Sequence, residues 1–151
     1  ELFQNTVLVI NRRDYSQAEV EDWASCGNNL SNIKERIETH YFVVAVNQQS
    51  QIVGFSSITP QGYLHSMFVH KDFQGEGIAT MLLEEIERYA ITAGITRITS
   101  EVSLTARPFF EKKGYVVEKE QKRKANQLSL TNFLMAKEVA FLEYYNKKVT
   151  D

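Results

Sequence analysis

The stretch from Gln74 to Ala79 (QGEGIA) has residue types and spacing that could bind phosphate. Gly75 and Gly77 let backbone N–H groups approach a ligand closely. A helix predicted to begin at Ile78 adds unpaired N–H donors and about half a positive charge at its N-terminus. Together they would form a cradle for a pyrophosphate. A single Gly-x-Gly before a helix is only moderately specific, because it is often just a tight turn.

This loop lacks the fingerprints of two common nucleotide sites. No Gly-Lys-Ser/Thr follows it, which excludes a P-loop. Ala79 comes too early to serve as the third glycine of a Rossmann fingerprint. Rossmann sheets also place that loop after the first strand, whereas here it follows at least two antiparallel-looking strands. A generic ATP- or NAD-binding protein is therefore the weaker interpretation.

Two side chains could act as a general base. His65 lies in a predicted strand whose alternation puts it on the same side as Tyr63 and Met67. Imidazole can act as a base near neutral pH. Glu101 lies near the end of a later strand. The alternative for His65 is a structural or surface histidine, and for Glu101 a solvated carboxylate at a strand edge.

Apolar periodicity predicts the elements that would position these residues. The predicted strands are Tyr41–Val46, Ile52–Ile58, Tyr63–Val69, Arg97–Val102, one that starts with Tyr115 to Lys119, and Leu130–Ala136. The predicted helices are Leu2–Ile10, one opened by a capping box at Ser16 and Glu19, a short one capped by Ser31 through Ile33 and Ile37, Ile78–Ala93 and Pro108–Lys113. The first two strands should form a hairpin. The fold class is therefore α/β (α+β).

Composition limits the function classes. The 151 residues make one domain, residues 1–151, and 43% hydrophobic residues with only 2 Pro and 7 Gly exclude a disordered or collagen-like chain. A net charge of −2 argues against nucleic-acid binding. The lone Cys26 excludes an intrachain disulfide and a cysteine-based zinc cluster, so no metal is expected. Neither a membrane span nor a signal peptide is evident, so we expect a cytoplasmic protein.

Four segments resemble the GCN5-related N-acetyltransferases (GNAT). Gln74 to Ala79 looks like the family's Q/R-x-x-G-x-G/A signature, and Met67 to Val69 lies five residues ahead of Gln74, as the family requires. Val102 to Tyr115 (VSLTARPFFEKKGY) resembles the next motif, and Phe133 to Lys137 resembles the closing strand. The chain is also similar to a subgroup of small bacterial acetyltransferases. The resemblance covers most of residues 14–137, with the elements in family order.

The resemblance implies a mixed, mostly antiparallel sheet, splayed at its middle strands, with helices on both faces. Acetyl-coenzyme A (acetyl-CoA) would lie in the splay. The implied coenzyme-binding residues are Met67, Phe68, Val69, Gln74, Gly75, Glu76, Gly77, Ile78, Ala79, Thr80, Phe109 and Phe110. A primary amine, of a small molecule rather than a protein tail, would attack the thioester directly and form a tetrahedral intermediate. A backbone N–H near Val69 would stabilise the oxyanion.

Two departures from the family matter. Phe110 stands where the family has a tyrosine that acts as general acid. The thiolate would then leave unprotonated or take a proton from water or another residue. The alternative is a coenzyme A sensor that binds without turnover. No strand precedes Leu2, where the family has one, which predicts a missing N-terminal segment.

Several residues have a functional and a structural interpretation. Trp23, Tyr41 and Tyr63 could bind the acceptor, or they could be packing residues. Thr105 is expected to cap a helix and Cys26 to be a small buried hydrophobe. The basic segment Lys119 to Lys124 could meet a phosphate or be a solvated hairpin face. Val139 to Lys148 could form an amphipathic helix that docks or makes a homodimer, or a frayed tail.

Overall fold

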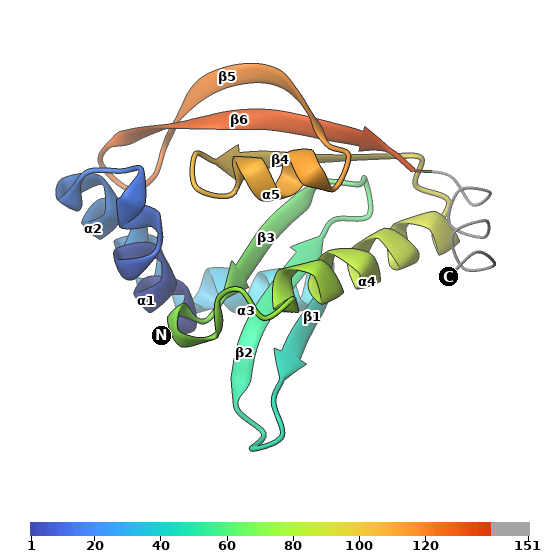
Figure 1. Cartoon of the computed structure of the whole chain (residues 1–151), viewed down its shortest axis with the longest axis horizontal. Coiled ribbons are helices and arrows are strands. Elements are labelled where there is room, and N and C mark those ends of the chain that lie inside the picture. The colour runs from blue at the N-terminus through green and yellow to red at the C-terminus, as the bar shows by residue number, and fades with distance from the viewer. Residues whose placement is uncertain (140–151) are drawn as a thin grey trace.

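The computed structural model describes residues 1–139 and contains two three-stranded antiparallel sheets, with strand orders β1-β2-β3 and β4-β6-β5 (Figure 1). The strands are β1 (Tyr41–Val46), β2 (Ile52–Ile58), β3 (Leu64–Val69), β4 (Arg97–Ser103), β5 (Val116–Lys124) and β6 (Ser129–Glu138). The helices are α1 (Leu2–Val9), α2 (Gln17–Ser25), α3 (Leu30–Thr39), α4 (Ile78–Thr92) and α5 (Arg107–Lys112).

The two sheets touch at one end and separate at the other. Tyr63 and Thr99 form an isolated parallel bridge, and the hydroxyl of Ser100 donates to the carbonyl of Leu64 at 2.8 Å. From there β3 turns away from β4 toward α1, as Figure 1 shows. The predicted mixed, mostly antiparallel sheet splayed at its middle strands is thereby confirmed.

A continuous core holds the two sheets together behind the splay. Ile58 and Leu64 of the first sheet pack with Ile98 and Met135 of the second and with Ile86 of α4, and each is at most 1% exposed. Helix α4 packs on β1, β2 and β3, while α3 packs on β1 from the other side (Figure 1). The predicted helices on both faces are confirmed.

The segment from α1 to α2 fastens the open end of the splay. Tyr15 donates its hydroxyl hydrogen to the carbonyl of Thr131 in β6 and accepts from the N–H of Leu104. The carboxylate of Asp22 accepts the N–H groups of the β5–β6 turn, which are those of Asn126, Gln127 and Leu128, at 2.9–3.0 Å. These N–H groups hold the pKa of Asp22 below its usual value, Leu128 having the largest effect.

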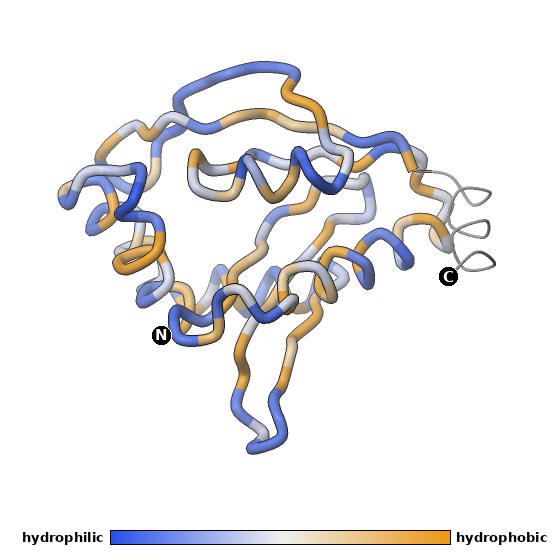
Figure 2. Tube along the Cα trace, in the orientation of Figure 1, coloured by the Kyte–Doolittle hydropathy of each residue, from blue (hydrophilic) through white to orange (hydrophobic). Residues whose placement is uncertain are grey.

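Two sequence-based boundaries need correction. Asn29, not Ser31, caps α3, because the Asn29 side chain accepts the N–H of Asn32. Strand β5 begins at Val116 rather than at Tyr115, and it continues to Lys124. It is hydrophilic over most of its length in Figure 2, and its Lys119–Lys124 side chains are solvent-facing except Gln121, which supports the solvated-face interpretation.

The predicted C-terminal helix falls outside the described residues apart from Val139, which packs on the core. Within residues 1–139 we find no helix that is long and apolar enough to cross a membrane.

Candidate active site

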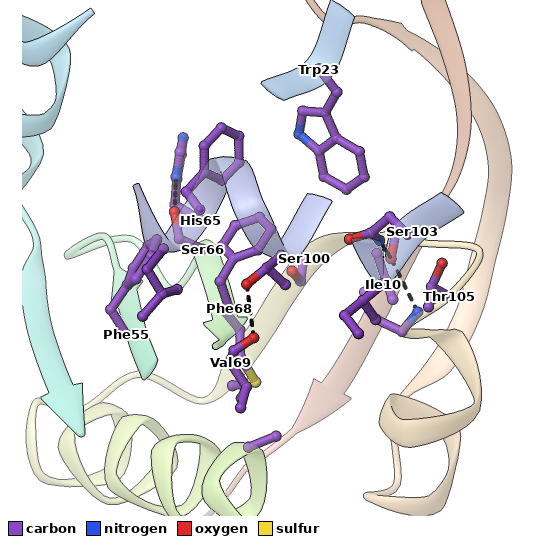
Figure 3. Close-up of a pocket in the computed structure, with 18 of the residues that line it drawn as sticks. Ile10, Trp23, Phe55, His65, Ser66, Phe68, Val69, Ser100, Ser103 and Thr105 are labelled. Carbon is purple, nitrogen blue, oxygen red and sulfur yellow. Dashed lines mark hydrogen bonds between the residues drawn. The ribbon is translucent and has the colours of Figure 1, made fainter. Parts of the chain in front are cut away.

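A cavity of about 1030 Å³ occupies the splay between β3 and β4. Of the residues predicted to be functional, those that line it are Trp23, Tyr63, His65, Met67, Phe68, Val69, Gln74, Gly75, Gly77, Ile78, Ala79, Thr80, Glu101, Phe109 and Phe110. Figure 3 shows Trp23 of α2 and His65, Phe68 and Val69 of β3 around this space. Tyr41 and Glu76 do not line it.

The glycine loop presents backbone donors to one end of the cavity. Gly75 and Gly77 have φ values of +76° and +81°, which L side chains rarely adopt. A Cβ atom at either position would have no neighbour within 4 Å, so the glycines are required by backbone conformation rather than by crowding. The first intrahelical bond runs from Met81 to Gly77, and Gly77 has no side-chain cap. The N–H groups of the first helical turn are therefore available to an anion.

Gln74 braces the loop against the end of β3. Its amide donates to the carbonyl of Val69 at 2.7 Å, and the same carbonyl accepts the hydroxyl of Thr6 from α1 at 2.9 Å. Sequence reasoning did not identify Thr6, because this contact joins residues 63 positions apart. The Gln74 side chain thus holds the glycine loop against the end of β3.

Strand β3 turns one backbone edge toward the cavity. Phe68 pairs with Phe55 of β2, and the N–H of His70 donates to the carbonyl of Val53 at 2.8 Å. Because backbone groups alternate along a strand, those of Met67 and Val69 face the opposite side, where β4 has diverged. This edge can pair with an extended ligand, as an additional strand would.

His65 is neutral in its surroundings. Its Nδ1 lies 2.7 Å from the hydroxyl of Ser66, and its ring is open to the cavity (Figure 3). Protein atoms crowd the rest of the ring, and this partial desolvation, with smaller effects from the Arg36 charge and from His40, lowers its pKa to about 4. The imidazole can therefore accept a proton at pH 7, but only as a weak base.

Glu101 and Tyr63 form a second polar group on the cavity wall. The Glu101 carboxylate accepts a hydrogen bond from Nε of Arg123 at 2.9 Å. Burial raises the pKa of Tyr63 to about 12, with a smaller effect from the negative charge of Glu101. The tyrosine is thus protonated at physiological pH, and the carboxylate is tied to a cation.

Phe110 and its neighbours close the cavity on the α5 side. Phe110 is 4% exposed and packs edge-to-face on Phe109 and Tyr115. The expected capping role of Thr105 is wrong: Ser103 accepts the N–H of Ala106 at 3.0 Å instead. The hydroxyl of Thr105 is buried and has no hydrogen-bond partner among residues 1–139 (Figure 3).

Three other predicted residues are placed as follows. Trp23 makes edge contacts with Phe3 and Phe68, so it packs and lines the cavity at once. Tyr41 stacks on Tyr89 and donates its hydroxyl to Glu85. Its predicted role in acceptor binding therefore has no support from the cavity geometry. Cys26 is exposed, so the expectation of a buried residue is wrong.

Arg36 also lines the cavity and was not identified from the sequence. It lies three residues after Ile33 and therefore on the same side of α3. A charged residue on the apolar side of a predicted helix was the one sequence feature that could have indicated Arg36. Within residues 1–139, no group of three or more His, Cys, Asp or Glu side chains is arranged to hold a metal ion.

Comparisons with known proteins agree with this geometry. Residues 11–138 match the family described as acetyltransferase (GNAT) domain. The chain is 28% identical to the uncharacterized N-acetyltransferase YafP of Escherichia coli over 135 residues, which is 89% of this chain and 83% of that protein.

Two solved structures share the fold. A GCN5-related N-acetyltransferase from Rhodopseudomonas palustris superposes with a TM-score of 0.87 at 28% identity, covering 91% of this chain and 86% of that one. The PaiA N-acetyltransferase of Thermoplasma acidophilum, solved with coenzyme A, gives a TM-score of 0.73 at 17% identity, covering 91% and 88%. The splayed sheet, the helix-terminal loop and the matched family together place the chain in the GNAT family, as an acyltransferase that uses acetyl-CoA.

Proposed function

We propose that this enzyme moves the acetyl group to the primary amine of a small molecule by direct attack on the thioester. The observation that carries the proposal is the continuity of one cavity from the α4 N-terminus, along the free edge of β3, to His65. Such a cavity can hold an extended coenzyme and an acceptor at the same time.

The coenzyme supplies an activated acetyl group, and the chain supplies its binding and orientation. The N–H groups from Gln74 to Thr80 hold the pyrophosphate, including that of Glu76, whose side chain lies outside the cavity. The hydroxyl of Thr80 adds a donor. Backbone groups of Met67 pair with the pantetheine arm, whereas the carbonyl of Val69 is already bound by Gln74 and Thr6 and only its N–H faces the coenzyme. Phe68, Phe109 and Phe110 supply apolar contacts along the arm and at the thioester. The open space in front of both loop glycines supports this placement.

His65 receives the proton that the amine releases, directly or through one water. When Nδ1 donates its hydrogen to Ser66, the lone pair at Nε2 is free to accept. Glu101 is the second candidate base, but one of its carboxylate oxygens is already engaged by Nε of Arg123. Tyr63, which lines the same wall, and Trp23 contact the acceptor. The N–H of Val69 is aimed at the oxyanion.

The leaving thiolate departs without an acid at Phe110. An alkyl thiol has a pKa of about 8.5, so its anion is stable enough to leave and be protonated by water afterwards. Phe110 then serves as an apolar wall that excludes bulk water from the thioester.

The first experiment is calorimetric titration with acetyl-CoA, with ATP and NAD as controls. We expect selective, single-site binding of acetyl-CoA. An amine panel follows, in which free lysine and a peptide that contains lysine present the same ε-amine. Acetylation of small amines supports the proposal. Acetylation of the peptide alone contradicts the small-molecule acceptor, and selective binding with no acetylated amine indicates a sensor.

A further inference from the structure

A second, smaller cavity of about 280 Å³ adjoins the first at His65. It is lined by Asn32, Glu35, Arg36, Thr39, His40 and His65. Asn32, Arg36 and His65 line both cavities, so the two spaces share a wall of side chains. Any group of the acceptor that extends beyond His65 therefore meets the side chains of α3.

The two histidines of this cavity are held in the same way. Their ring centroids are 5.5 Å apart. Nδ1 of His65 lies 2.7 Å from the hydroxyl of Ser66, and Nδ1 of His40 lies 3.5 Å from that of Ser57. Ser57 and Ser66 are cross-strand partners on β2 and β3, and both are buried. With Nδ1 engaged, the Nε2 atom of each ring is left for a ligand.

Arg36 is the permanent cation of the small cavity. It is half-buried and forms no ion pair with residues 1–139. Its charge contributes to lowering the pKa of both His40 and His65, which shows that the guanidinium acts on both rings. Glu35 is the acidic residue on the same wall, but it is exposed, where water screens its charge. A half-buried guanidinium of this kind is stabilised when it meets an anion.

We propose that the small cavity binds an anionic group of the acceptor, so that the substrate is an amine that also carries a carboxylate or a phosphate. The planar fork of Arg36 fits either group with two parallel hydrogen bonds. Asn32, Thr39 and Nε2 of His40 can supply further donors, whereas Nε2 of His65 stays free to accept the amine proton. Because His65 lines both cavities, the amine reaches the thioester while the anion rests on Arg36. This inference rests on the proposed amine acetylation.

A kinetic test compares acceptors that differ only in the anion. Tyramine and tyrosine are one pair, and ethanolamine and phosphoethanolamine are another, which separates the carboxylate from the phosphate. In Arg36→Gln we expect kcat/KM to fall about 10- to 100-fold more for the anionic member than for the neutral member, because a hydrogen-bonded ion pair is lost only with the anionic acceptor. Lys34→Gln is the control, because it removes a positive charge from the exposed side of the same helix, outside both cavities. It should leave kcat/KM unchanged for the neutral and the anionic acceptors alike.

Equal losses for the neutral and anionic members in Arg36→Gln would overturn the proposal, as would a wild-type preference for the neutral members. Glu35→Gln gives a test of opposite sign. Because water screens much of the negative charge of Glu35, removing it should lower KM for the anionic acceptors only slightly, and should change KM for the neutral acceptors less. A raised KM for the anionic acceptors would contradict the site.

A binding test does not depend on turnover. The chain has three histidines, and His70 lies outside both cavities, so its imidazole resonance is an internal control. N-acetyltyrosine should shift the His40 and His65 resonances and leave His70 unchanged, whereas N-acetyltyrosinamide, which lacks the carboxylate, should shift them less. Such shifts without acetylation of any amine would uphold the anion site and refute the amine transfer. Acetylation without these selective shifts would refute the anion site alone.

Discussion

A histidine that is neutral well below pH 7 has a particular kinetic consequence. The pKa of His65 is about 4, lowered first by partial desolvation and then by the Arg36 charge. The base is therefore already unprotonated over the whole range in which an alkylammonium begins to lose its proton. The rise of kcat/KM with pH should then belong to the acceptor and not to the enzyme.

Replacement of His65 by Gln tests this proton path. We expect kcat/KM to fall about 100-fold at every pH above 5, while the midpoint of its rise with pH stays where the acceptor sets it. The pH–rate profile with one amine measures both quantities. Glu101→Gln is the matched control, because it removes the rival base without changing its shape. A larger loss in Glu101→Gln than in His65→Gln would assign the base to the carboxylate.

Phe110→Tyr tests whether the leaving group needs an acid. Because the thiolate leaves unaided in our proposal, kcat should change by less than about threefold. The new hydroxyl enters the packed contact with Tyr115 and should cost about 1–3 kcal/mol of unfolding free energy, measured by denaturant titration. Phe109→Tyr, one residue earlier and less buried, should cost less. A rise of kcat by tenfold or more, about 1.4 kcal/mol of barrier, would show that protonation of the thiolate limits the reaction.

At the level of elements, α4 begins and ends with glycines in the same conformation. Gly77 and Gly94 both have φ of +81°, and neither would crowd an added Cβ. They form a matched pair, since one precedes the predicted phosphate cradle and the other follows the far end of the helix.

Alanine at either position should destabilise the fold by about 1–2 kcal/mol, because a left-handed backbone is strained by a Cβ. Gly77→Ala should in addition weaken acetyl-CoA binding about 10-fold or more, because the first-turn N–H groups move. Calorimetric titration of both variants, with unfolding curves beside it, separates the effects. Equal affinities for acetyl-CoA in the two variants would show that the pyrophosphate does not bind at the N-terminus of α4.

The local elements were predictable because their signals are local. The glycine loop and α4 follow from a motif and one apolar periodicity, and Ser16 with Glu19 forms the expected capping box. The end of strand β5 could not be predicted because, beyond Val117, its residues are polar on both faces, so no alternation of apolar and polar residues marks them. Backbone pairing with β6 keeps these residues in a strand. The sequence of one segment does not show which other segment it pairs with.

Contacts across the chain account for the site residues that the sequence did not indicate. Thr6 reaches Val69, and Asn11 lies near Ser103, 92 positions away. Arg36 became a cavity residue only because α3 packs beside β3 at His65. The predicted coenzyme-binding residues of the glycine loop lie close together in the sequence, whereas the side chains around His65 come from distant segments.

At the scale of the whole molecule, Asp22 links the N-terminal helices to the second sheet. Its carboxylate binds three N–H groups of the β5–β6 turn, which keep its pKa below the usual value. A lowered folded-state pKa means that the stabilisation is complete above the unfolded pKa, about 3.9, and is lost as pH falls through the lower folded value.

Asp22→Ala should therefore lower Tm at pH 7, and the difference from wild type should shrink steadily below about pH 4. Thermal unfolding at several pH values between 7 and 2 measures it. Asp14→Ala is the control, because Asp14 is an exposed aspartate in the same region whose side chain makes no hydrogen bond to residues 1–139. A Tm difference that persists unchanged at pH 2 would show that Asp22 acts through packing and not through its charge.

The splay also bears on aggregation. Unpaired strand edges invite pairing with other chains, and separating β3 from β4 creates two of them in the middle of the molecule. The β3 edge opens inside the cavity, where α1 crosses it and Thr6 binds the carbonyl of Val69. The outer edge of β5 carries charged side chains that discourage a neighbour. The fold can thus keep a strand edge available for a ligand without offering it to another protein molecule.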